Sequence, residues 1–169
     1  MSHYYIGLLS GTSMDGVDAA IVDFDDHKPK LIAYHAEPIP ELLREKTRLL
    51  CVPGDNEINR LGAADVEWGR LFATATQKLL KHAGISAKEI IAIGSHGQTI
   101  RHKPYDAVPF TLQIGDPNTI AALTQITTVA DFRRMDIAFG GQGAPLAPAF
   151  HRYLLQHVQH DTMVVNIGG

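Results

Sequence analysis

Residues 11–18 carry the first group of side chains that could do chemistry. They have the G-x-x-x-x-G spacing of a P-loop, but Val-Asp stands where that loop has Lys-Ser/Thr. Glycines at both ends allow positive φ, so successive N–H groups can form a nest for phosphate oxygens. The hydroxyls add donors, and Asp15 and Asp18 suit a hydrated Mg²⁺ that bridges to phosphate. The candidate phosphate-binding residues are Gly11, Thr12, Ser13, Met14, Asp15, Gly16, Val17 and Asp18.

This loop stands between two apolar runs that read as strands, whereas a P-loop joins a strand to a helix. A Walker-type mechanism is therefore not expected. A plain β-hairpin turn uses the same residue types and remains the structural alternative.

His96 belongs to a second candidate group, because it directly follows an apolar segment at residues 90–94. Open α/β sheets bind ligands outside the carboxyl ends of their strands, so His96 could hydrogen-bond a sugar or phosphate oxygen. Ser95 beside it is not expected to form a hydrolase dyad, since adjacent residues of an extended chain point opposite ways. The alternative is a histidine in a strand-end turn whose hydrogen bonds only stabilise the fold.

Arg133 and Arg134 form a third group, flanked by Asp131 and followed by a glycine-rich segment that contains Gln142. Paired guanidinium groups can hold a carboxylate through bidentate hydrogen bonds. The alternative is an internal salt-bridge cluster that braces the loop.

Apolar runs and helical spacing predict the elements that must position these groups. In order, they are strands at residues 4–9, 17–24 and 30–36 in an antiparallel meander, helices at 41–50 and 57–82, strands at 90–94 and 110–114, a helix that starts at Pro117, an ordered loop at 131–148, a helix at 149–157 and a last strand at 162–169. Residues 90–94 are continuously apolar, which predicts a buried central strand with residues 95–98 after its end. The long helix carries an apolar stripe from Ile58 to Leu79, including Trp68, which predicts core packing.

Composition limits the classes of protein. The chain has 169 residues, a 45% hydrophobic fraction and a net charge of −3, which is typical of a globular domain and gives no basic footprint for nucleic acid. Cys51 is the only cysteine, so an internal disulfide is excluded. No apolar run is long enough to span a bilayer and no export signal is visible, so no membrane partner and a cytoplasmic location are expected.

The sequence resembles the anhydro-N-acetylmuramic acid kinases in five blocks that keep the family's order. These are LSGTSMDGVD at residues 9–18, SHGQT at 95–99, QIGD at 113–116, ADFR at 130–133 and GGQGAPL at 140–146. The resemblance implies the sugar kinase/Hsp70/actin superfamily. It implies an α/β, ribonuclease-H-like lobe with a mixed β-sheet, in which an antiparallel meander is followed by parallel strands and flanked by helices.

The resemblance also implies an activity. Water attacks the anomeric carbon of 1,6-anhydro-N-acetylmuramic acid while O6 takes the γ-phosphoryl group of ATP, with Mg²⁺, in the recycling of cell-wall sugars. For this activity we expect Arg133 or Arg134 to bind the lactyl carboxylate, His96, Asp131 and Gln142 to line the sugar site, and Asp15 and Asp18 to hold hydrated Mg²⁺.

The resemblance further predicts that residues 1–169 are the amino-terminal lobe of a two-lobe kinase, that residues 165–169 begin a second phosphate loop, and that the catalytic Asp base lies downstream. The fragment alone is therefore expected to have negligible activity. Two alternatives stay open: a non-catalytic actin-like nucleotide-binding module, and a related kinase for a different sugar. A homodimer also stays open.

Overall fold

A mixed sheet forms the centre of the molecule, of which the computed structural model describes residues 3–24, 29–156 and 158–165. In these residues the sheet has six strands in the order β3-β2-β1-β4-β5, and β6 pairs with β4 beside β5. The strands are β1 (Tyr4–Ser10), β2 (Val17–Asp23), β3 (Lys30–Glu37), β4 (Ile90–Lys103), β5 (Phe110–Ile114) and β6 (Thr128–Ala130).

The sheet combines both strand orientations. β1, β2 and β3 form the predicted antiparallel meander, and β4 then runs parallel to both β1 and β6. This pattern confirms the expected mixed sheet. It also makes residues 11–16 the turn of the β1–β2 hairpin, with Leu9 opposite Asp18 in register.

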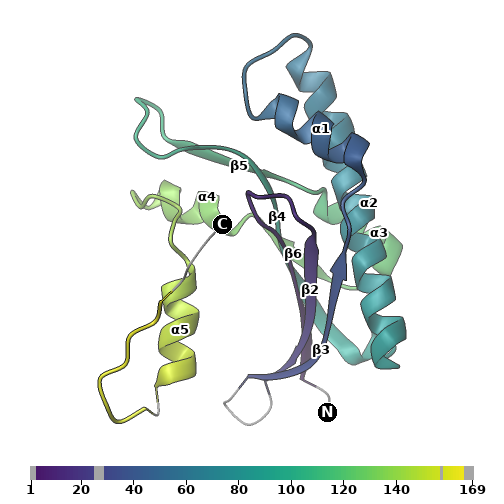
Figure 1. The fold of residues 1–169 in the computed structure, drawn as a ribbon, viewed down its shortest axis with the longest axis vertical. Helices are drawn as coiled ribbons and strands as arrows, with labels where there is room; N and C mark the ends of the chain where they lie inside the picture. Colours follow the sequence, from purple (N-terminus) through teal and green to yellow (C-terminus); the bar gives the residue numbers. More distant parts are fainter. Residues whose placement is uncertain (1–2, 25–28, 157, 166–169) are drawn as a thin grey trace.

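Helices lie on both sides of this sheet: α1, α2 and α3 on one side, α4 and α5 on the other (Figure 1). Their bounds are α1 (Glu41–Leu50), α2 (Glu57–Ala83), α3 (Pro117–Thr124), α4 (Phe132–Ala138) and α5 (Ala147–Leu155), with a short 3₁₀ turn, η1, at Ala87–Glu89. Among the described residues, no helix is both long and apolar enough to cross a membrane.

The main core lies between the sheet and α2. Trp68 and Phe72 have no exposed surface, and each such side chain contributes roughly 1.5–3 kcal/mol on burial. The Trp68 indole N–H donates to the Thr47 hydroxyl of α1 at 2.9 Å, which satisfies the only polar atom of the ring. The predicted apolar stripe is therefore confirmed, except that Ile58 in its first turn is 85% exposed.

The helix ends follow the signals in the sequence. Gly84 ends α2 in the left-handed conformation, and Ser86 forms a capping box with Glu89. The Asp116 carboxylate accepts from the first free N–H groups of α3, with Pro117 in the first turn. This cap matters for the site because α3 begins beside the strand end of β5.

The prediction that a strand ends at residue 94 is wrong. β4 continues to Lys103, because residues 98–103 pair with the antiparallel strand β5. Residues 95–98 therefore lie within the strand and not after it. Ile91 is 45% exposed, so the first half of β4 is not buried on both faces.

Two further expectations need correction. The segment at 131–148 was expected to be a loop, but it contains the helix α4, which begins directly after Asp131. Residues 162–165 do not form the predicted strand. The rest of that strand, and most of the proposed second phosphate loop, lies outside the described residues.

Candidate functional site

The hairpin turn between β1 and β2 is anchored to the protein on one side and exposed to solvent on the other. Met14 is 8% exposed, so it anchors the turn in the core, and its N–H donates to the Gly11 carbonyl at 3.1 Å. The Arg44 Nε of α1 donates to the Met14 carbonyl at 3.1 Å. Thr12 and Ser13 are exposed, so their hydroxyls and nearby backbone are available to a ligand.

Asp15 and Asp18 are both exposed on this hairpin. Asp18 Oδ1 accepts a hydrogen bond from the Tyr34 hydroxyl, and this bond raises the pKa of Tyr34. No group of three His, Cys, Asp or Glu side chains in the described residues forms a ready metal site. Mg²⁺ usually takes one or two carboxylates together with water and phosphate oxygens, and each of these exposed carboxylates is a ligand of the type that such an ion takes.

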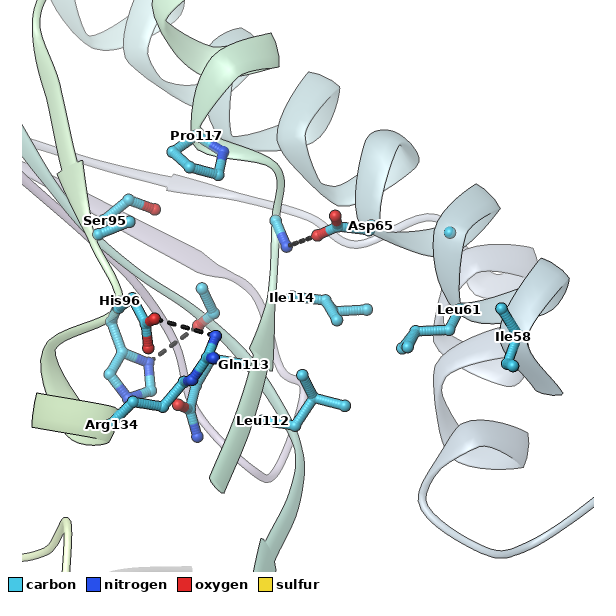
Figure 2. A pocket seen from close by; sticks show the side chains of 15 residues that line it. Ile58, Leu61, Asp65, Ser95, His96, Leu112, Gln113, Ile114, Pro117 and Arg134 are labelled. Atoms are coloured by element: carbon cyan, nitrogen blue, oxygen red, sulfur yellow. Dashed lines mark hydrogen bonds and ion pairs between the residues drawn. The ribbon is translucent and has the colours of Figure 1, made fainter. Parts of the chain in front are cut away.

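A cavity of about 490 Å³ lies between α2, β4, β5 and the start of α4 (Figure 2). His96, Asp131 and Arg134 line it, so the structure brings these predicted site residues together. A smaller cavity of about 180 Å³ is lined by Thr12, Thr99, His102, Gln113, Arg133 and Ala144. This smaller cavity joins the hairpin turn to Arg133.

Arg133 is held in place by two hydrogen bonds. Its Nε donates to His96 Nε2 at 2.7 Å, and its Nη1 donates to the Gly143 carbonyl at 2.6 Å. Burial lowers the pKa of the guanidinium, and no carboxylate of the described residues pairs with it. The remaining N–H donors of a half-buried guanidinium without an anionic partner can bind a carboxylate.

Arg134 has a different environment. Its Nη1 pairs with Asp131 Oδ2 at 3.1 Å, and both side chains are largely exposed. The salt-bridge alternative is thus realised for Arg134 and not for Arg133. The neighbouring arginines also line different cavities.

Asp136 braces the glycine-rich segment that follows α4. Its Oδ2 accepts from the Gly143 N–H at 2.6 Å, and its own carbonyl accepts from the Gly141 N–H at 2.8 Å. This bracing fixes the Gly143 carbonyl that Arg133 contacts. Gln142 is exposed and lines neither of the two cavities, so nothing in this geometry brings it to the other predicted residues.

The structure adds polar groups that the sequence did not single out as ligands. The Ser95 side chain is 1% exposed, lines the larger cavity, and its hydroxyl has no partner among the described residues (Figure 2). Gln113 lines both cavities and its buried Oε1 is likewise unpaired. Asp65 of α2 accepts from the Gly115 N–H at 2.7 Å, and burial raises the pKa of its carboxyl.

Signals for these groups in the sequence are weak. Gln113 stands in one of the five blocks, but Asp65 occupies an ordinary polar position of a helix and carries no signal of its own. Ser95 is conspicuous only because its hydroxyl is buried without a partner, and burial is not visible in the sequence.

A mixed sheet that opens with a three-stranded antiparallel meander, continues with parallel strands and has helices on both sides defines a ribonuclease-H-like lobe of the actin-like kind. Within that class, the model of the anhydro-N-acetylmuramic acid kinase family matches residues 3–169, and the chain belongs to this family.

Curated relatives agree with this placement. The chain is 58% identical over 166 residues to an anhydro-N-acetylmuramic acid kinase of Shewanella halifaxensis, which covers 98% of the chain and 45% of the relative. It is 59% identical over 167 residues to one of Shewanella loihica, with 99% of the chain and 45% of the relative covered. The chain therefore spans about half the length of these relatives.

Proposed function

We propose that this chain is the amino-terminal lobe, residues 1–169, of a two-lobe ATP-dependent sugar kinase in the cytoplasm. Its substrate is 1,6-anhydro-N-acetylmuramic acid and its products are N-acetylmuramic acid 6-phosphate and ADP, in the recycling of cell-wall sugars. Family membership, the names of the relatives and the share of their length that the chain spans support this proposal.

One observation carries the proposal: Thr12 of the hairpin turn and the unpaired guanidinium of Arg133 line one cavity. A kinase for an acidic sugar needs a place for the phosphoryl donor and a cation for the sugar carboxylate within one substrate's length of each other. The lactyl carboxylate of the substrate supplies the anion that Arg133 lacks.

In the proposed reaction, water attacks C1 of the sugar, so a C1–O bond to water forms and the C1–O6 bond breaks. O6 forms a new bond to the γ-phosphorus while the bond from that phosphorus to the ADP oxygen breaks. The proton of water passes to a carboxylate base outside the described residues. Phosphoryl transfer needs mainly positioning and charge neutralisation, which the hairpin turn supplies through N–H and hydroxyl groups.

Asp15 and Asp18 would hold Mg²⁺ through water, and the ion would neutralise charge on the phosphates. Arg133 binds the carboxylate of the sugar, rather than Arg134, which already has a carboxylate partner. His96, Asp131 and Gln142 lie on the sugar side of this arrangement in the proposal.

The test is a chimera that joins residues 1–169 to the remaining carboxy-terminal part of the Shewanella halifaxensis relative. We expect ADP release with 1,6-anhydro-N-acetylmuramic acid, and much weaker turnover with the corresponding anhydro-N-acetylglucosamine, which lacks the lactyl carboxylate. The 169-residue chain alone should show negligible turnover.

The outcomes separate the alternatives. ATP binding without turnover on any sugar indicates a nucleotide-binding module. Faster turnover with hexoses than with the anhydro sugar indicates a kinase for a different sugar. Either result overturns the proposed function.

A further inference from the structure

We propose that His96 is a positioning residue: in its neutral form it holds Arg133 in the orientation that binds the substrate carboxylate, and its protonation releases that arginine. The inference rests on the proposed function for the identity of the acidic ligand. It gives His96 a task different from direct contact with the sugar.

The hydrogen-bond partners of the His96 ring fix one tautomer. Arg133 Nε is always a donor, so His96 Nε2, which lies 2.7 Å from it, must be the unprotonated acceptor. Nδ1 lies 2.9 Å from the Gly97 carbonyl, which can only accept, so Nδ1 carries the proton. Both ring nitrogens are therefore occupied before any substrate arrives.

The same contacts leave one edge of Arg133 for a ligand. Nε is used by His96 and Nη1 donates one hydrogen bond to Gly143. Nη2 and one N–H of Nη1 have no partner among the described residues, and such donors can bind the two oxygens of a carboxylate. A guanidinium fixed at two of its nitrogens loses less conformational entropy when it binds.

Protonation of His96 removes this arrangement. A proton on Nε2 would face the Nε–H of Arg133 at hydrogen-bond distance, and the two groups would carry like charges. Burial, with the charge of Arg133 as a further cause, lowers the pKa of His96, while its bond to the Gly97 carbonyl acts in the opposite direction. The neutral form is therefore dominant near pH 7, and the protonated form appears only in acid.

Other charged groups around His96 have to be distinguished from it. Asp65 of α2, Asp131 before α4 and Arg134 of α4 line the same cavity, and the last two are paired with each other. The facing strands β5 and β6 carry no titratable side chain. Asp65 is one competing source of pH dependence, because burial raises the pKa of its carboxyl. Two further ionisable groups lie near Arg133: His102 of β4 lines the smaller cavity with it, and Asp136 of α4 accepts from the Gly143 N–H.

The kinetic test uses the chimera and follows KM and kcat for the anhydro sugar from pH 5 to pH 8. The unsubstituted protein should show KM rising as pH falls, with kcat following any separate titration of the catalytic base. His96→Ala should raise KM at pH 7 roughly tenfold, the equivalent of about one hydrogen bond to a charged donor. The matched control is His82→Gln, at the exposed end of α2.

Rescue by glutamine makes the test specific. The Oε1 of a glutamine can occupy the place of His96 Nε2 and accept from Arg133, but it does not protonate in this range. His96→Gln should therefore recover most of the affinity that His96→Ala loses, and its KM should no longer rise in acid. A rise that persists in His96→Gln overturns the proposal, and Asp65→Asn and His102→Gln then show which other group causes it.

A second readout needs no kinase activity. Nitrogen NMR of the imidazole in the unsubstituted 169-residue chain should show a protonated Nδ1 and a bare Nε2, and the Arg133 Nε–H resonance should shift when His96 titrates. A protonated Nε2 in the neutral ring, or an Arg133 signal that ignores the titration, overturns the inference. If the chimera is inactive, the proposed function fails, and this measurement still decides the role of His96.

Discussion

Replacing Arg133 by alanine should raise the KM for the anhydro sugar strongly and leave kcat nearly unchanged. Arg133 has no carboxylate partner among the described residues, whereas the neighbouring Arg134 is paired with Asp131. In the proposed reaction the sugar carboxylate is remote from the reacting C1 and O6 atoms, so Arg133 should bind it equally in the ground state and the transition state. Loss of such uniform binding appears in KM and not in kcat.

The magnitude follows from the contacts. A hydrogen bond to a charged group contributes about 1.5–3 kcal/mol, and every 1.4 kcal/mol changes an equilibrium constant about tenfold. Arg133→Ala should therefore raise KM by roughly 10- to 150-fold. Arg134→Ala removes an exposed ion pair that contributes about 0–1 kcal/mol, so its effect should stay below about fivefold. Arg133→Lys keeps the charge but not the two parallel donors of the guanidinium, so its increase in KM should lie between those of Arg133→Ala and Arg134→Ala.

Initial-rate ADP release by the chimera, with the anhydro sugar varied at saturating ATP, measures these effects. The thermal unfolding midpoint of each variant shows whether the fold is intact. Equal effects of Arg133→Ala and Arg134→Ala would refute the assignment, and so would a fall in kcat at unchanged KM. A second check is the analogue without the lactyl carboxylate, whose KM should not respond to Arg133→Ala.

Three predictions concern the folded chain itself. Ser95→Ala removes a buried hydroxyl that has no partner among the described residues, so urea unfolding should show about 1 kcal/mol more stability, and a loss would contradict this account. Gly97→Ala places a Cβ 2.5 Å from a β5 carbonyl oxygen at a residue with φ +75°, so it should lower the free energy of unfolding by at least about 1–2 kcal/mol. Gly7→Ala, with open space around the new Cβ, should lower it far less in the same assay. Glu37 is buried and paired with Lys78 and a histidine; burial raises the pKa of its carboxyl, but these partners lower the pKa overall. The stabilisation that Glu37 contributes is therefore present above its unfolded-state pKa and disappears as the pH falls through its folded-state pKa. Glu37→Gln should flatten this acid dependence of the unfolding free energy.

The sequence predicts those parts of the fold whose signals are local. The β1–β2 hairpin follows from two apolar runs around a glycine-containing turn, and the end of α2 follows from Gly84. The second half of β4 is different, because its residues are mostly polar and become a strand only through pairing with β5. The helix α4 is short and lies beside glycines, so its residues carry too few helical repeats to predict it.

The candidate site likewise has features that the sequence predicts locally and features that depend on contacts between distant segments. The sequence supplies both arginines and leaves the choice between them open, because residue type does not reveal a partner. The choice depends on Asp131, which forms an ion pair with Arg134, and on His96, which accepts a hydrogen bond from Arg133. The unpaired hydroxyl of Ser95 likewise depends on burial by segments far away in the sequence.

The position of His96 depends on a bulge in β4. Between the pairs Leu8–Ser95 and Ser10–Gln98 of the parallel ladder, β4 has one more residue than β1. Gly97 absorbs this extra residue with its positive φ, so His96 leaves the alternation of the strand and its ring contacts Arg133. The hydroxyl of Ser10, at the base of the hairpin turn, donates to Gln98 just past the bulge at 2.7 Å. Because one irregularity sets both contacts, a change at Gly97 should disturb the orientation of Arg133 and the base of the hairpin turn together, although Arg133 and Ser10 both lie far from Gly97 in the sequence.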